Sequence, residues 1–87
     1  MEFGWDPEKA SANAKKHSVE FSEAMTVFGD PLEVMIADPD HSGHEQRFLS
    51  IGTSATGRLL VVSYTERAGR TRLINAREAS AQERRDH

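Results

Sequence analysis

The segment from Leu59 to Glu78 constrains the fold most, because two runs typical of β-strands lie here on either side of a tight turn. The runs 59–65 and 71–76 are rich in β-branched and aromatic residues, and a short polar link containing Ala68-Gly69 joins them. A link this short joins antiparallel neighbours. The segment therefore predicts a β-hairpin around which the rest of the chain is arranged.

The two faces of this hairpin are expected to differ in chemistry, because side chains alternate along a strand. The expected cross-strand pairs on one face are Arg67 with Arg70, Thr65 with Arg72, Ser63 with Ile74 and Val61 with Ala76. The other face holds the expected core residues Leu60, Val62, Tyr64 and Leu73, with Arg77 emerging at its far end. Clustered guanidinium groups suit phosphate binding. The same composition also fits a solvated face balanced by nearby carboxylates.

The length of 87 residues predicts one small domain that spans residues 1–87. The chain has no cysteine, which excludes a disulfide framework, a thiolate nucleophile and a zinc-thiolate site. No stretch approaches the roughly 20 apolar residues of a membrane span, and the N-terminus lacks the pattern of a signal peptide. We therefore expect a soluble, cytoplasmic protein without a membrane partner.

Charge is distributed unevenly along the chain. The net charge of −3 argues at first against a nucleic-acid partner, because phosphate binding usually leaves a basic footprint. Residues 1–45, however, hold three lysines and ten acidic residues, a net charge of −7, whereas residues 46–87 hold eight arginines and four acidic residues, a net charge of +4. This asymmetry predicts an arginine-bearing sheet backed by an acidic helical layer.

The N-terminal third predicts two helices. Asp6-Pro7 is a strong helix start, because Asp is a favoured N-cap and Pro fits the first helical position, and the helix is expected to reach about Lys16. Residues 21–28 carry apolar side chains at i, i+3, i+4 and i+7, which predicts a second, amphipathic helix. Two helices this short cannot bury a core alone, so they are expected to cover one face of a sheet.

Two further strands are expected before the hairpin, at residues 32–37 and 46–52. The loop between them, 38–45, holds two Asp, two His and a Glu, but it lacks a recognised ligand spacing and fits ordinary turn chemistry, so no metal or other cofactor is expected. A capping-box pattern at Ser80 and Glu83 predicts a short final helix. The expected fold is α+β, with two N-terminal helices packed on a four-stranded antiparallel sheet and a short C-terminal helix. Residues 1–5 fit either a short edge strand or an anchored arm.

Four motifs, in order, resemble the BrnT family. They are F-x-W-D-P-x-K-A-x-x-N-x-x-K-H at 3–17, F-x-E-A-x-x-V-F-x-D-P at 21–31, D-x-D-H-S-x-x-E-x-R-F at 38–48 and R-L-I-x-A-R-x-A-x-x-x-E-R-R at 72–85. The resemblance covers essentially the whole chain. It implies a fold similar to RelE and ParE toxins, and the ribonuclease activity of a type II toxin that a BrnA antitoxin neutralises.

Cleavage of RNA without a metal ion needs a general base for the 2′-hydroxyl, cations for the pentavalent phosphate and an acid for the leaving 5′-oxygen. Arginines suit the second task. His17 suits acid-base work because the ordinary pKa of histidine is about 6.5, and Lys16 or Glu66 are further candidates. The expected catalytic residues are Arg67, Arg72, Arg77, His17, Lys16 and Glu66, and the expected RNA-binding residues are Arg47, Arg70 and Lys9.

The basic end of the first helix has a second interpretation. Lys15, Lys16 and His17 occupy its last turn, where positive charge also interacts favourably with the helix dipole. These residues therefore serve either the stability of the helix or the chemistry of a site.

Two classes of function remain open from the sequence. The first is an endoribonuclease toxin that cleaves RNA and inhibits translation; the second is a non-catalytic module whose arginine face binds an acidic partner or nucleic acid. The resemblance implies a BrnA-like antitoxin in a hetero-oligomer, expected to hold two toxins on an antitoxin dimer. Its interface is expected to cover Arg67, Arg70 and Arg72, and operator DNA is expected to bind only through the antitoxin.

Overall fold

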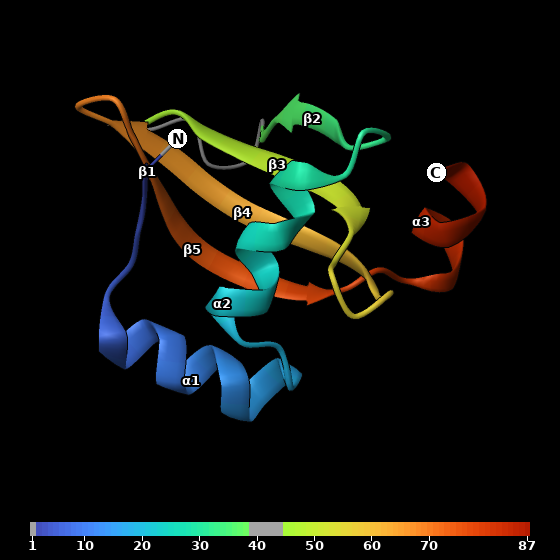
Figure 1. Cartoon of the computed structure of the whole chain (residues 1–87), viewed down its shortest axis with the longest axis horizontal. Helices are drawn as coiled ribbons and strands as arrows, with labels where there is room; N and C mark the ends of the chain where they lie inside the picture. Colours follow the sequence, from blue (N-terminus) through green and yellow to red (C-terminus); the bar gives the residue numbers. More distant parts are fainter. Residues whose placement is uncertain (1, 39–44) are drawn as a thin grey trace.

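Five strands form one sheet; the helical segment at residues 21–29 lies across one of its faces, and the helix at residues 7–17 lies beside the strand at residues 70–78, at the edge of the sheet (Figure 1). The computed structural model describes residues 2–38 and 45–87. From the N-terminus the elements are β1 (Glu2–Gly4), α1 (Pro7–His17), α2 (Phe21–Ala24), the 3-10 helix η1 (Met25–Gly29), β2 (Val34–Ala37), β3 (Arg47–Thr53), β4 (Leu59–Arg67), β5 (Arg70–Glu78) and α3 (Ala81–Asp86). The strand order is β1-β5-β4-β3-β2.

The prediction of a four-stranded, purely antiparallel sheet is wrong, because β1 adds a fifth strand that runs parallel to β5. Phe3 lies opposite Thr71 in this pairing, and its ring packs on Phe28 with centroids 5.2 Å apart. Partial burial of this aromatic side chain against the core holds the first strand at the sheet edge. The remaining strands form the expected antiparallel meander.

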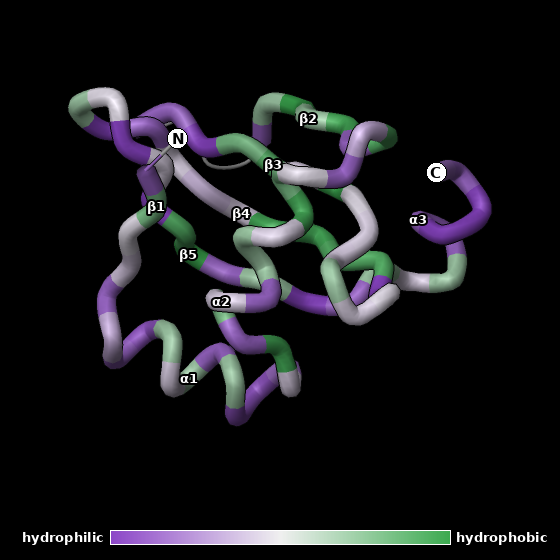
Figure 2. The backbone as a smooth tube through the Cα atoms, viewed as in Figure 1, coloured by the Kyte–Doolittle hydropathy of each residue, from purple (hydrophilic) through white to green (hydrophobic). Residues whose placement is uncertain are grey.

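The hydrophobic core lies between the sheet and the helical layer. The helical side contributes Val19, Phe21, Ala24 and Val27, and the sheet contributes Leu60, Val62, Tyr64, Leu73 and Ala76. The four side chains expected on the core face of the hairpin are therefore confirmed there. The hydrophobic stretches of β3 and β4 contrast with the hydrophilic α3 in Figure 2.

The two N-terminal helices begin where the sequence predicts. The Asp6 carboxylate accepts a hydrogen bond of 2.9 Å from the backbone N–H of Glu8, with Pro7 at the first helical position. The second helix differs from the prediction, because it changes from α to 3-10 geometry after Ala24. The β-branched residue Thr26 donates its hydroxyl to the carbonyl of Glu23 at 2.6 Å within this tightened turn.

A β-bulge in the central hairpin changes the expected register. Near the turn, Arg67 lies opposite Arg70 and Thr65 opposite Arg72, as predicted. The register then shifts at Ser63, which pairs with Asn75 and leaves Ile74 as the extra residue. The predicted pairs of Ser63 with Ile74 and of Val61 with Ala76 are therefore wrong.

The bulge also moves Arg77 to the other face of the sheet. Val61 lies opposite Arg77, so this arginine belongs to the face away from the helices, and the prediction that it emerges on the apolar face is wrong. We call this face, which carries Arg47, Leu49, Ser63 and Arg72, the outer face. No helix in residues 2–38 and 45–87 is long and apolar enough to cross a membrane.

Candidate active site

The carboxylate of Glu45 lies near three guanidinium groups at one end of the outer face. Arg67 donates a hydrogen bond from Nε to Oε2 of Glu45 at 2.9 Å, and its Nη2 makes a second contact with the same oxygen. This hydrogen bonding, together with the positive charges of Arg67, Arg47 and Arg72, holds the pKa of Glu45 below its ordinary value. We call Arg47, Arg67 and Arg72 the arginine cluster.

The sheet register explains why these arginines meet. Arg47, Thr65 and Arg72 form one row across β3, β4 and β5. Thr65, in the middle, is buried, and its hydroxyl donates to the carbonyl of Gln46 at 2.8 Å. This bond fixes the start of β3 and therefore the position of Glu45, which immediately precedes Gln46.

The turn of the hairpin brings one further arginine, Arg70, next to Arg67. Ala68 and Gly69 both have positive φ angles, 53° and 78°, as a two-residue hairpin turn requires. Arg67 and Arg70 therefore face each other at the tip of the hairpin. Both line a hollow of about 380 Å³ together with Trp5 and Arg72, so an indole ring lies beside three guanidinium groups. Such a combination suits a nucleobase stacked beside a bound phosphate.

The basic residues of α1 line the continuation of the outer face. Lys9, Lys16 and His17 border one hollow, whose sheet side is formed by Ile74 and Asn75 at the bulge. A second hollow, of about 420 Å³, is lined by Lys9 again, by the two bulge residues, and by Asp38, Arg47, Leu49 and Ser63. This volume lies within the range of roughly 300 to 1,000 Å³ typical of ligand sites. Because the two hollows share three residues, we describe them together as the basic groove.

Asn13 fixes α1 against the sheet beside this groove. Its side chain is buried and donates hydrogen bonds of 2.9 Å to the carbonyls of Val19 and Ala76, while its Oδ1 accepts one of 3.1 Å from the N–H of Ala76. These bonds join α1, the link to α2 and the edge of β5. The helix is thereby held where Lys16 and His17 reach the basic groove.

The structure brings together most, but not all, of the predicted site residues. Three of the predicted residues, Arg67, Arg70 and Arg72, line the hollow at the hairpin tip, and four others, Arg47, Lys9, Lys16 and His17, line the basic groove. Glu66 is elsewhere, because it lies opposite the buried Thr71 and its carboxylate accepts a hydrogen bond of 3.1 Å from that hydroxyl. Arg77 is also distant, five residues along β5 from Arg72, which at about 3.3 Å per residue is roughly 16 Å.

Arg77 is engaged in a structural ion pair at the other end of the sheet. Its two terminal nitrogens donate to the two carboxylate oxygens of Glu83 at 2.8 and 3.0 Å. This contact, assisted by the backbone N–H of Ser80, lowers the pKa of Glu83 to about 2. The expected capping box of α3 is confirmed at the same place. Arg77 therefore fastens α3 to the sheet.

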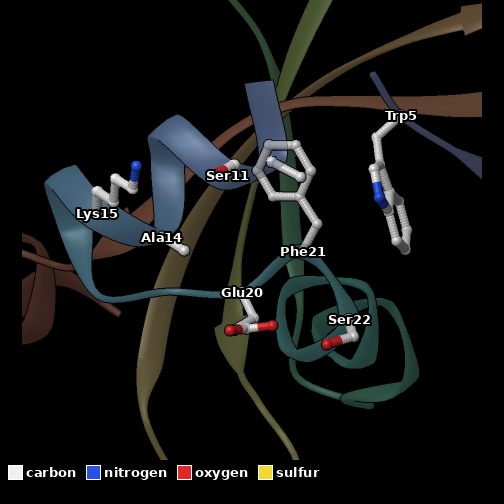
Figure 3. Close-up of a pocket in the computed structure, with 8 residues that line it drawn as sticks. Trp5, Ser11, Ala14, Lys15, Glu20, Phe21 and Ser22 are labelled. Atoms are coloured by element: carbon white, nitrogen blue, oxygen red, sulfur yellow. The ribbon is translucent and has the colours of Figure 1, made fainter. Parts of the chain in front are cut away.

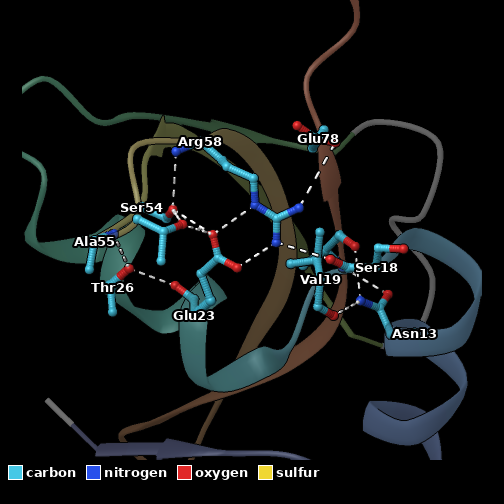
Figure 4. A network of polar contacts seen from close by, with 11 residues as sticks. Asn13, Ser18, Val19, Glu23, Thr26, Ser54, Ala55, Arg58 and Glu78 are labelled. Atoms are coloured by element: carbon cyan, nitrogen blue, oxygen red, sulfur yellow. Dashed lines mark hydrogen bonds and ion pairs between the residues drawn. The ribbon is translucent and has the colours of Figure 1, made fainter.

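A partly buried polar network has a similar structural role on the helical side (Figure 4). Arg58 binds Glu23 through Nε at 3.0 Å and through Nη2 at 2.5 Å, and it also donates to the carbonyl of Ser18 at 3.0 Å. Ser54 and Thr56 donate their hydroxyls to the same carboxylate. These bonds join the start of α2 to the turn between β3 and β4.

A further hollow lies between α1 and α2, with Phe21 between Trp5 and the small side chains of α1 (Figure 3). Its only charged lining residues are Lys15 and Glu20, one of each sign. It lacks the clustered cations of the outer face. We therefore place the candidate active site on the outer face.

Sequence reasoning missed Glu45 as a site residue. The signal for Glu45 in the sequence is its position two residues before Arg47, within the E-x-R-F part of a family-like motif, but the acidic composition of loop 38–45 by itself indicates only turn chemistry. Residues 39–44 of that loop lie outside the described residues. Trp5, Asn13 and Asn75 were also missed as contributors to the site, because their roles depend on contacts distant in sequence.

Comparison with known proteins identifies the fold and the family of the chain. A search of solved structures finds the 1.1 Å crystal structure of the Brucella abortus ribonuclease toxin BrnT, with a TM-score of 0.68 and 20% sequence identity over 92% of this chain and 97% of that one. At this identity the likeness shows that the two share a fold. Among curated proteins no sequence matches. Residues 5–83 match the family described as the ribonuclease toxin BrnT of type II toxin-antitoxin systems, so the chain belongs to the BrnT toxin family.

Proposed function

We propose that this chain is an endoribonuclease toxin that cleaves RNA on its outer face without a metal ion, and thereby inhibits translation and growth. The observation that carries the proposal is the position of Glu45 within the arginine cluster, next to the basic groove. Three guanidinium groups supply the charge needed to bind a phosphodiester and to stabilise its pentavalent transition state. Membership of a ribonuclease toxin family supports the same reaction class.

In the proposed mechanism Glu45 acts as the general base. Its lowered pKa keeps it ionised but makes it a weak base while Arg67 holds it. When a phosphodiester binds the arginine cluster, the anion takes over these guanidinium contacts, and its negative charge raises the pKa of the released carboxylate. Glu45 then accepts the 2′-hydroxyl proton as the 2′-oxygen attacks phosphorus.

The other half of the reaction requires a proton donor. The bond from phosphorus to the 5′-oxygen breaks, and His17 or Lys16, both bordering the basic groove, donates a proton to the leaving oxygen. The products are a 2′,3′-cyclic phosphate and a 5′-hydroxyl. Lys9 and Arg70 contact the flanking backbone, and Trp5 offers a face for base stacking.

We propose that the physiological partner is a BrnA-like antitoxin, in a hetero-oligomer of two toxins and two antitoxins. Acidic side chains of the antitoxin cover Arg67, Arg70 and Arg72, and operator DNA binds through the antitoxin alone. The contact between Arg67 and Glu45 supports this, because it shows that a carboxylate fits the arginine cluster. The net charge of −3 is compatible with DNA affinity supplied by the partner.

The same contact favours one alternative function, a non-catalytic module that only binds acidic segments or nucleic acid. The deciding experiment incubates the purified chain with an RNA oligonucleotide and with DNA of the same sequence, both in excess EDTA. We expect cleavage of the RNA alone, with 2′,3′-cyclic phosphate ends. RNA binding without cleavage would favour the module, and cleavage that requires added Mg²⁺ would contradict the proposed mechanism.

A further inference from the structure

Strand β2 forms an exposed apolar edge of the sheet. It pairs with β3 on one side, and no other strand among the described residues pairs with its second side. Its hydrophobic side chains are unusually open to solvent, with exposed fractions of 48% for Val34, 56% for Met35 and 45% for Ile36, and Leu32 just before it is 73% exposed. Figure 2 shows this segment as a hydrophobic stretch at the border of the sheet. Unpaired edges of this kind are templates for strand addition.

The direction of the backbone groups follows from one hydrogen bond. The N–H of Asp38 donates to the carbonyl of Arg47 at 2.8 Å, so residue 38 is directed at β3. Because antiparallel pairing alternates, Val34 and Ile36 are also directed at β3, whereas the N–H and C=O groups of Met35 and Ala37 point to the second side. The edge therefore offers two residues for pairing with an added strand.

The outer face changes from apolar to basic along this edge. Val34 lies beside Ile51, and Ile36 beside Leu49, so these side chains form an apolar strip on the outer face. The C-terminal end of β2 adjoins Arg47, the first member of the arginine cluster. A segment laid along β2 would thus meet hydrophobic side chains first and guanidinium groups at its end.

We propose that an extended segment of the antitoxin adds to β2 as a sixth strand, with apolar side chains on Val34 and Ile36 and acidic side chains at the end beside Arg47. This inference rests on the antitoxin partner proposed above and names the surface and the mode by which it docks. It ties neutralisation to the active site, because the same segment that pairs with the edge delivers its carboxylates to the arginine cluster.

A second copy of this chain fits the edge less well. In an antiparallel pairing of β2 with its own twofold mate, the outward-directed residues 35 and 37 pair with each other, so the residue of the mate opposite Asp38 is the apolar Leu32, Val34 or Ile36. Such a pairing supplies no acidic group to the arginine cluster.

Hydrogen exchange of the unmodified chain tests the edge directly. The probe is the protein encoded by the reading frame adjacent to that of the toxin, purified and added in excess. We expect the amides of Met35 and Ala37 to exchange rapidly in the free chain and at least tenfold more slowly in the complex. The amides of Val34 and Ile36, already directed at β3, should change little. Unchanged exchange at Met35 and Ala37 in a formed complex would overturn the proposal.

A matched pair of variants provides the second test. Met35→Pro removes the outward N–H and blocks the added strand without removing a bond to β3, since Pro is tolerated on an edge strand. Met35→Thr keeps the N–H and the β propensity. We expect Met35→Pro to weaken antitoxin binding at least tenfold and Met35→Thr to weaken it less than threefold, with RNA cleavage by the free chain unchanged in both.

The outcomes of this test separate the proposals from one another. If a folded Met35→Pro variant bound the antitoxin as tightly as the unmodified chain, the proposed docking on β2 would be overturned. A dimer of the free chain that this variant dissociates would overturn it as well. If the Pro variant fails to fold by circular dichroism, the exchange pattern of the unmodified chain decides. Failure of that chain to cleave RNA, with the binding pattern intact, would count against the ribonuclease mechanism alone; failure to bind the neighbouring protein would overturn the antitoxin partner and the edge assignment together.

Discussion

Asn13 and Ala76 exchange two hydrogen bonds, in which the Asn13 side chain pairs with the backbone of Ala76 as a neighbouring strand would. The amide of Asn13 donates to the Ala76 carbonyl at 2.9 Å and accepts from the Ala76 N–H at 3.1 Å. Strand β1 pairs with β5 only at residues 70–72, so this part of the β5 edge requires another partner. A single side chain thus completes the sheet edge and positions α1 beside the candidate site.

Replacing Asn13 is therefore expected to destabilise the fold strongly. Asn13→Ala removes three hydrogen bonds and leaves buried backbone groups of Ala76 and Val19 unsatisfied. We expect a loss of about 2 to 4 kcal/mol in the free energy of unfolding, measured by urea denaturation. The exposed Ser11→Ala on the same helix is the control, with an expected change within about 0.5 kcal/mol. Equal stability of both variants would contradict the role of Asn13.

The arginine cluster is expected to be essential for cleavage. Arg67→Ala or Arg72→Ala should each reduce the cleavage rate by about 100- to 1,000-fold, because a preorganised cation that stabilises the transition state is lost. Arg84→Ala, which removes the same charge from the exposed α3, should leave the rate unchanged. The measurement is single-turnover cleavage of labelled RNA, with thermal melts to confirm folding. Full toxicity of a folded Arg67→Ala, Arg72→Ala double variant would remove this face from the mechanism.

Glu45→Gln should separate RNA binding from catalysis. The amide keeps the size of the side chain but cannot accept the 2′-hydroxyl proton, so the rate should fall by about 100-fold or more. RNA affinity should hold or increase, because a negative charge leaves the arginine cluster. Glu66→Gln is the matched control, since its carboxylate lies on the opposite face and contacts Thr71. A larger rate loss in the control would transfer the role of base to Glu66.

His17→Gln tests whether the end of α1 takes part in chemistry. If His17 donates the proton to the leaving oxygen, the unmodified chain should show a limb near neutrality in its profile of rate against pH, and the variant should lose that limb. If His17 serves only the helix dipole, the variant should lose about 0.3 to 1 kcal/mol of stability, with activity per folded molecule unchanged. Paired rate profiles and denaturation curves distinguish the two outcomes.

The ion pair of Glu23 with Arg58 should make the fold sensitive to acid. Hydrogen bonding to Arg58 holds the pKa of Glu23 at about 2, below the ordinary 4.5, so the unfolded state binds the proton more tightly. Its contribution is complete above pH 4.5 and is lost as pH falls toward 2. We expect a loss of about 1 to 2 kcal/mol from this group, allowing for partial exposure of the pair. Arg58→Gln should reduce the loss seen in denaturation curves between pH 5 and pH 2.5.

Features set by nearby residues were predictable from the sequence. The turn at Ala68-Gly69 fixes the pairing of Arg67 with Arg70, and strand alternation then assigns Arg72 to the outer face and Leu73 to the core. Asp6-Pro7 starts α1 for reasons of local capping. These features depend on interactions between residues a few positions apart, so the pattern of the sequence contains them.

Features that depend on distant residues required the tertiary structure. The sequence does not show that Phe3 packs on Phe28 and thereby adds β1 to β5, nor that the backbone of Ala76 pairs with the side chain of Asn13. The bulge at Ile74 shifts the register by one residue, which alone moves Arg77 to the outer face.

The sequence by itself determined the hairpin, its arginines, its core face and the kinship with BrnT toxins. Only the tertiary structure decided which carboxylate joins the arginines. Glu45 precedes β3 and Glu66 lies within β4, both arginine-bearing strands. Alternation directs Glu66 to the helical side, whereas Thr65 holds the start of β3 so that Glu45 reaches Arg67. The physical reason is that a site on a sheet combines residues by strand register, and register depends on contacts that no short stretch of sequence contains.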